Sequence, residues 1–123
     1  MDDYMFFYEN NKDKYTIICL YVREAHFVER DENNNIVSGW PIGYFEYEYP
    51  QHKTIDDRLN MARKLEWKIP TYIDNMENTF DNIYGAWPDS LFVFNNGKYI
   101  FKAKLEYDGY RFDAFTKQLE NIL

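Results

Sequence analysis

The first half of the chain combines one strongly apolar run with two stretches of helical periodicity. Apolar residues recur at the spacing of one helix face over residues 2–11 and again over about residues 55–66, which predicts two helices. Thr54 is a candidate N-cap for the second helix, and Pro70 ends it. Between them, residues 15–22 form a continuous β-branched and aromatic run, typical of a strand buried on both faces in an α/β sheet.

Shorter segments connect and follow these elements. Residues 29–35 are uniformly polar and predict a surface loop, whereas residues 40–50 are aromatic but interrupted by proline and glycine, which indicates an irregular connection or an edge strand. Residues 71–73 predict a short strand and residues 76–84 a short helix. Asp74, directly after that strand, is a candidate cap for the next segment.

The end of the chain predicts a hairpin followed by a helix. Residues 91–94 and 98–104 are apolar strand candidates on either side of Asn96-Gly97, a pair that favours a tight turn because both residues accept positive φ. A surface helix with one buried face is then indicated by four apolar residues at helical spacing: Phe112, Phe115, Leu119 and Ile122. Together, the elements predict a single α/β domain over residues 1–123.

Composition and charge reduce the number of function classes that fit the chain. The 123 residues are 46% hydrophobic and 20% aromatic, enough to build a packed core. The formal net charge of −7 disfavours nucleic acid and anionic membranes as partners. No apolar run reaches the length of a membrane span, and the acidic N-terminus is unlike a signal peptide. Cys19 is the sole cysteine, which excludes an intrachain disulfide and favours a cytoplasmic or other reducing compartment, not secretion.

Several segments resemble segments of the iodothyronine deiodinases and occur in the same order along the chain. The Glu-Ala-His of YVREAH, the SGW at residues 38–40 and Gly109-Tyr110 each have a counterpart in that family. Longer matches follow one another almost without gaps from residue 52 onward: HKTIDDRLNMA, DNMENTFDNIYGAWP and LFVFNNGKYIFK. The resemblance covers roughly residues 15–122 and implies a thioredoxin-like fold with a mixed sheet, a C-terminal β-hairpin and a closing helix.

The resemblance also implies roles for particular residues. Glu24 and His26 match the family's glutamate and histidine, which are implied in proton supply and substrate contact. Their alternative interpretation is structural, as the polar end of a strand. His52 matches a histidine associated with the phenolic ring of the substrate, or is an ordinary residue before a helix cap. Arg58 matches the helix arginine, although a structural surface role is the stronger expectation.

Trp87-Pro88 matches the thioredoxin-fold position that usually carries a cis peptide beside the active site, and an aromatic residue before proline favours cis. We expect both residues to border the ligand site. Ser90 stands where the family has an arginine associated with gripping the substrate. This departure weakens the expectation that the ligand is thyroid hormone itself.

The family's nucleophile, a selenocysteine or cysteine, has no counterpart here. By family spacing it belongs within about ten residues upstream of Met1, so we expect the chain to lack the usual first strand. Cys19 falls inside the next strand and is expected to be a small core residue. The acidic and histidine residues match no strong metal pattern, and we expect neither a metal nor another cofactor.

Three functional hypotheses remain open. The chain is a non-catalytic deiodinase-like module that binds a small aromatic ligand or a protein, a fragment of a longer selenocysteine- or cysteine-dependent deiodinase or thiol oxidoreductase, or a structural module. A missing central strand leaves a gap in the sheet. The gap has three candidate solutions. Residues 16–22 could pair directly with residues 91–94, residues 1–8 could fill the gap, or a second copy of the chain could fill it in a homodimer.

Overall fold

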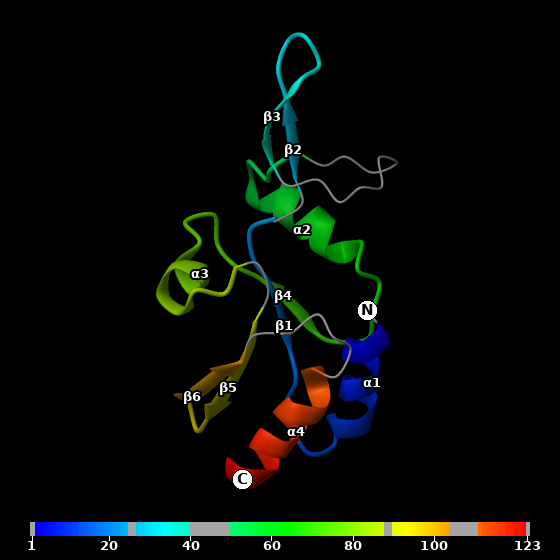
Figure 1. Cartoon of the computed structure of the whole chain (residues 1–123), viewed down its shortest axis with the longest axis vertical. Coiled ribbons are helices and arrows are strands. Elements are labelled where there is room, and N and C mark those ends of the chain that lie inside the picture. Colours follow the sequence, from blue (N-terminus) through cyan, green and yellow to red (C-terminus); the bar gives the residue numbers. More distant parts are fainter. Residues whose placement is uncertain (1, 25–26, 40–49, 88–89, 104–110, 123) are drawn as a thin grey trace. The chain divides into compact units, whose positions relative to one another are not determined.

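The computed structural model describes residues 2–24, 27–39, 50–87, 90–103 and 111–122. Within these ranges it contains four helices and six short strands, which confirms the α/β class (Figure 1). The strands pair in three two-stranded sheets. The chain divides into two compact units, Met1–Ile17 with Asp89–Leu123, and Ile18–Pro88. The expectation of one domain stays a prediction.

The first unit is built on aromatic contacts between two helices. Helix α1 (Asp2–Asn11) and helix α4 (Arg111–Ile122) lie side by side, and Phe112 contacts Tyr4 and Phe7 with ring centroids 5.3 and 5.0 Å apart (Figure 1). Phe115 is buried and also meets Phe7. Residues 2–11 are therefore helical as predicted, so residues 2–8 do not form a strand.

Two strands complete the first unit. β5 (Leu91–Asn95) and β6 (Lys98–Ala103) form the predicted antiparallel hairpin. Asn96 and Gly97 both have positive φ, at 52° and 77°, as the tight turn requires. On α4, Phe115 and Leu119 form the buried face, but Ile122 in the last turn is 45% exposed, so the predicted apolar stripe stops one turn early.

The second unit contains a parallel pair of strands. β1 (Cys19–Tyr21) pairs with β4 (Thr71–Ile73), in register from Cys19 opposite Thr71 to Tyr21 opposite Ile73. β1 is shorter than the apolar run that predicted it. All three of its residues are half-buried and Ile18 before it is exposed, so the expectation of burial on both faces was wrong. A face is buried by elements packed over it, and the neighbouring strand β4 covers only an edge of β1.

A second hairpin was not predicted. β2 (Val28–Arg30) and β3 (Ile36–Gly39) pair antiparallel across the polar tract that was expected to be a plain loop. The Asp31 carboxylate accepts the backbone N–H groups of Asn33 and Asn35, at 2.9 Å each, and so closes the turn. The irregular connection expected over residues 40–50 lies almost entirely outside the described residues.

Two helices flank the parallel strands. α2 (Ile55–Arg63) begins at Thr54, whose hydroxyl accepts the N–H of Asp57 while the Asp57 carboxylate accepts the N–H of Thr54. The predicted N-cap is therefore confirmed as a reciprocal capping box. α3 (Thr79–Tyr84) is the second, shorter helix. The Asp74 carboxylate accepts the N–H groups of Phe80 and Asp81 in its first turn, which confirms Asp74 as a cap.

Candidate functional site

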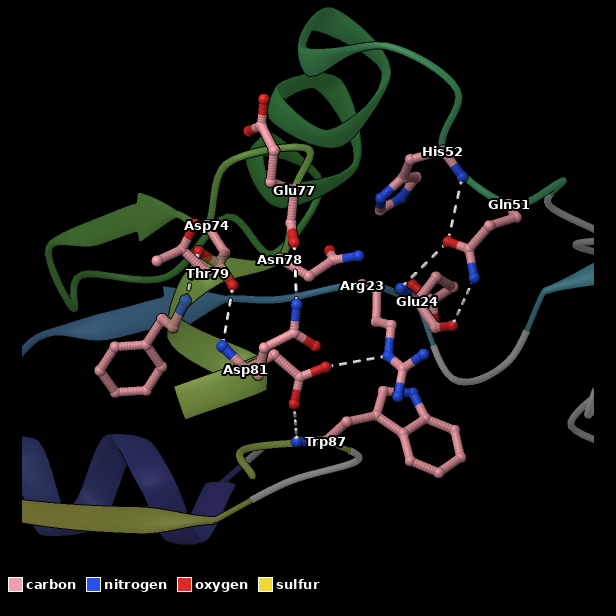
Figure 2. Close-up of polar contacts among 12 residues, drawn as sticks. Arg23, Glu24, Gln51, His52, Asp74, Glu77, Asn78, Thr79, Asp81 and Trp87 are labelled. Carbon is pink, nitrogen blue, oxygen red and sulfur yellow. Dashed lines mark hydrogen bonds and ion pairs between the residues drawn. The ribbon is translucent and has the colours of Figure 1, made fainter. Parts of the chain in front are cut away.

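His52 lies just before the start of α2 and is the best-placed candidate in the second unit. Its side chain is only 7% exposed. Its backbone N–H donates to the Gln51 side-chain oxygen at 3.1 Å, and the capping box begins two residues later (Figure 2). The segment that carries the imidazole is therefore held from both sides by hydrogen bonds.

The imidazole of His52 has two different environments at its two nitrogens. Nδ1 accepts a hydrogen bond of 3.4 Å from Nε of Arg58. Nε2 is fully buried and has no hydrogen-bond partner among the described residues. Burial, followed by the positive charge of Arg58, lowers the pKa of His52 from its ordinary value. The ring is therefore neutral near pH 7 and has one unused polar atom.

Tyr21 and Glu24 border the same imidazole from the end of β1. The Tyr21 and His52 rings lie with centroids 5.7 Å apart. The Tyr21 hydroxyl donates a short hydrogen bond to the Glu24 carboxylate. Burial first, and then this hydrogen bond, raise the pKa of Tyr21, so it stays a neutral phenol.

Gln51 joins the Glu24 segment to the His52 segment. Its side-chain oxygen accepts the backbone N–H of Glu24 at 3.3 Å, and its side-chain nitrogen donates to the Glu24 carbonyl at 3.1 Å (Figure 2). An amide that pairs with both backbone groups of one residue acts as a short piece of sheet. This contact fixes the distance between the two predicted site residues, Glu24 and His52.

Arg58 contacts the imidazole through Nε and is 2% exposed. Nη1 donates to the carbonyls of Asp74 and Asn75 at 3.1 and 2.7 Å, and Nη2 donates to Oδ1 of Asn78 at 2.9 Å. Burial lowers the pKa of Arg58, and the nearby Asp74 carboxylate opposes this effect. An arginine so enclosed supports other groups and does not present its guanidinium to solvent.

Asp81 organises the segment that leads to Trp87. Its buried carboxylate accepts the backbone N–H of Trp87 at 2.8 Å through Oδ1 and forms an ion pair of 2.9 Å through Oδ2 with Nε of Arg23 (Figure 2). The Arg23 N–H is not aligned as a hydrogen bond to that oxygen. The Arg23 guanidinium also lies 5.1 Å from the Trp87 ring centre, a cation–π contact. These contacts hold Trp87 in place, and the residue is 36% exposed.

The remaining predicted residues divide into two groups. His26 and Pro88 lie outside the described residues, so the proposed role of His26 and the cis Trp87-Pro88 peptide stay predictions. Ser90 is described, and its buried hydroxyl has no partner among the described residues. It belongs to the other compact unit.

Cys19 does not have the environment of a nucleophile. It lies in β1, where burial raises its pKa to about 11 despite a hydrogen bond with Thr71. Within the described ranges, no three His, Cys, Asp or Glu side chains gather closely enough to hold a metal ion. None of the helices in those ranges combines the length and apolar character that a membrane crossing needs.

Comparison with known proteins decides the family. The sequence profile of the iodothyronine deiodinases matches residues 4–123. The chain belongs to the iodothyronine deiodinase family. It is 28% identical over 106 residues to the thyroxine 5-deiodinases of Sus scrofa and Homo sapiens, an alignment that covers 84% of this chain and 32% of each relative. It is 26% identical over 106 residues to the type I iodothyronine deiodinase of Xenopus laevis, covering 38% of that protein. The chain thus spans about a third of the length of the curated relatives it matches.

The structure adds site residues to those taken from the deiodinase resemblance. It brings the candidates Glu24, His52 and Arg58 together through hydrogen bonds, and adds Tyr21 and Gln51 to the cluster. Tyr21 is the first residue of the YVREAH segment, so its place in that motif could have identified it as a site residue. Gln51 had no signal beyond its position before His52, because its pairing with Glu24 joins residues 27 positions apart.

Proposed function

We propose that this member of the deiodinase family binds the phenolic ring of a small aromatic ligand through His52, and that the chain as given does so without reducing the ligand. The observation that carries the proposal is the buried Nε2 of His52, which has no partner among the described residues. A buried polar atom without a partner costs free energy, so such an atom marks a place where a ligand group is expected.

The chemistry of the neighbouring groups favours a phenolate as that ligand group. Since Nδ1 of His52 accepts from Arg58, the neutral ring carries its proton on Nε2, which is then a donor. An iodinated phenol is readily ionised and offers a negatively charged oxygen acceptor. His52 also lines a cleft of about 310 Å³ together with Gln51, Met61 and Lys64, a volume suited to a small aromatic molecule.

The non-catalytic part of the proposal depends on the sulfur chemistry of the chain. Its one cysteine has a pKa of about 11, so almost none of it is thiolate near neutral pH. Reductive deiodination by this family requires an anionic sulfur or selenium nucleophile. The alternative, that the chain is a fragment of a longer selenocysteine- or cysteine-dependent deiodinase or thiol oxidoreductase, is compatible with the family match and would use the same phenol site.

We also propose that the domain adopts the thioredoxin-like arrangement expected from the family. The order of elements supports it: the parallel pair of β1 and β4 is followed by an antiparallel hairpin and a closing helix. An experimental structure of the chain tests this fold. A homodimer formed through an incomplete sheet is the third hypothesis, and a monomer in light scattering at all concentrations would overturn it.

Titration calorimetry with 2,6-diiodophenol and thyroxine tests ligand binding directly. Asparagine at position 52 offers an oxygen near the place of Nδ1 and so keeps an acceptor for Arg58, but it removes the Nε2 donor. Glutamine places an amide nitrogen near Nε2 and keeps that donor. Losing a hydrogen bond to a charged acceptor costs about 1.5–3 kcal/mol, so we expect His52→Asn to weaken diiodophenol binding about 10- to 100-fold.

The control variants separate recognition from misfolding. We expect His52→Gln to bind more tightly than His52→Asn, and Glu32→Gln, an exposed substitution in the β2–β3 turn, to bind like the wild type. Equal affinities for His52→Asn and the wild type would overturn the binding proposal. Iodide release from thyroxine with a thiol reductant, at a rate lost in His26→Ala, would overturn the non-catalytic proposal.

A further inference from the structure

The guanidinium of Arg58 is fixed by contacts that have nothing to do with His52. Two backbone carbonyls and the Asn78 amide oxygen hold Nη1 and Nη2 at 2.7–3.1 Å. These acceptors follow β4 and precede α3, and the side chain is 2% exposed. With its terminal nitrogens fixed in this way, the remaining N–H on Nε points at Nδ1 of His52.

This geometry permits only one protonation pattern of the imidazole. A guanidinium N–H donates and never accepts, so Nδ1 must present its lone pair. A neutral ring then carries its one proton on Nε2. A doubly protonated ring, or the tautomer with hydrogen on Nδ1, would set two N–H groups against each other in a buried place.

The other charged and titratable groups around His52 do not reverse this preference. Glu24 and Asp57 raise the pKa of His52, and Arg58 and burial lower it, with burial the largest effect and lowering the net direction. The Tyr21 ring faces the imidazole, but its hydroxyl is already committed to Glu24. The balance therefore favours the neutral ring.

We propose that Arg58 is a positioning residue that holds His52 as the Nε2–H tautomer and thereby restricts the site to ligand groups that accept a hydrogen bond. The proposal rests on the proposed function for its ligand but not for the state of the imidazole. It assigns Arg58 a role through His52, since its own guanidinium is buried. A phenolate, carboxylate or carbonyl oxygen fits the site because it accepts a hydrogen bond. An ammonium group does not fit, because it only donates.

The first test is the tautomer in the free protein. Two-bond ¹H–¹⁵N correlation spectra of ¹⁵N-histidine-labelled chain distinguish a protonated from an unprotonated ring nitrogen, and His26→Gln assigns the two histidines. We expect Nδ1 of His52 to be unprotonated and Nε2 protonated at pH 7.5. A His52 that is protonated on Nδ1 at that pH overturns the proposal, and this measurement needs no substitution at Arg58.

Substitutions at Arg58 give the second test. Arg58→Met removes both the donor and the charge, so we expect signal from the Nδ1–H tautomer and a higher titration midpoint for His52. Arg58→Lys keeps a charge nearby without the Nε donor, so the midpoint should stay closer to that of the wild type while the tautomer preference is lost. A folded Arg58→Met protein with an unchanged tautomer and an unchanged midpoint contradicts the proposal.

The two proposals fail in different ways. If the free protein shows the Nε2–H tautomer but diiodophenol does not bind, the binding proposal fails and the positioning role of Arg58 stands. If diiodophenol binds to a ring protonated on Nδ1, the positioning role fails and the binding proposal stands. Binding of 4-iodoaniline, which offers a weak neutral amine, should be much weaker than that of diiodophenol, and equal binding would overturn the restriction to acceptor groups.

Discussion

At the scale of single residues, the reactivity of Cys19 tests whether burial suppresses the thiolate form of the only thiol in the chain. Burial raises its pKa from 9.0 to about 11, a difference of about two pH units. Since the thiolate is the reactive form, we expect native Cys19 to react with iodoacetamide at pH 8 about 100-fold more slowly than in the unfolded chain. The measurement is the modification rate by mass spectrometry with and without urea. Similar rates in the two states would contradict the prediction.

The same scale shows how far sequence can identify the site. Glu24, His52 and Arg58 were candidates because they lie within segments that match the family. Their mutual contacts were not, because Arg58 reaches the carbonyls of Asp74 and Asn75, and a backbone carbonyl has no sequence signal. The expectation that Arg58 is a surface helix residue failed for that reason: the acceptors that enclose it come from the segment after β4.

At the scale of secondary-structure elements, the capping box at the start of α2 has a measurable stability. Thr54→Ala removes the hydroxyl that accepts the Asp57 N–H and should lower the free energy of unfolding by about 1 kcal/mol. Urea unfolding followed by circular dichroism measures this. Thr54→Ser keeps the hydroxyl, and serine is at least as good an N-cap, so the free energy of unfolding should be close to that of the wild type. If serine and alanine cost the same, the hydroxyl is not the source of the stability.

The β5–β6 turn offers a second test at this scale. Gly97 has φ +77°, and a Cβ added there meets nothing within 4 Å. Gly97→Ala should therefore cost about 1 kcal/mol through backbone strain alone. Thermal unfolding measures the loss. Gly97→Asn, with a residue that accepts this conformation better, should cost less, and a larger cost for asparagine than for alanine would contradict the backbone explanation.

Sequence predicted the elements unequally, and the differences have physical causes. The two hairpin residues Asn96 and Gly97 and the cap Thr54 are local signals, so the structures they predict were found. The β2–β3 hairpin was missed because its strands are three and four residues long, and Ile36 and Val37 on β3 are exposed, so no alternating pattern marks it. Its turn depends on Asp31, one more polar residue in a polar tract.

At the scale of the whole molecule, net charge and the buried His52 have opposite effects on stability as the pH falls. The formal net charge of −7 becomes less negative toward the isoelectric point near 4.8, which reduces repulsion across the chain. His52 opposes this effect, because its pKa in the folded chain lies below the ordinary value of 6.5. The unfolded chain therefore binds this proton more readily than the folded chain does.

The sign of the resulting pH dependence follows from proton linkage. The stabilising contribution of neutral His52 is complete above about pH 6.5 and is lost as the pH falls from there through the lower folded pKa. The slope for one proton is at most about 1.4 kcal/mol per pH unit. Asp57, whose pKa is lowered from 3.8, changes charge only in more acidic solution and does not contribute in this window.

The free energy of unfolding of wild type and His52→Gln, measured by urea titration between pH 7.5 and 5.0, tests this linkage. Glutamine does not titrate, so subtracting the variant curve removes the effects of net charge and of all other groups that the two proteins share. We expect the free energy of unfolding of the wild type to fall relative to that of His52→Gln as the pH falls. The change should develop around pH 6.5, since an unfolded histidine is half-protonated there. Parallel curves would mean that His52 titrates equally in both states, which would contradict a buried neutral ring and with it the donor that the phenol site requires.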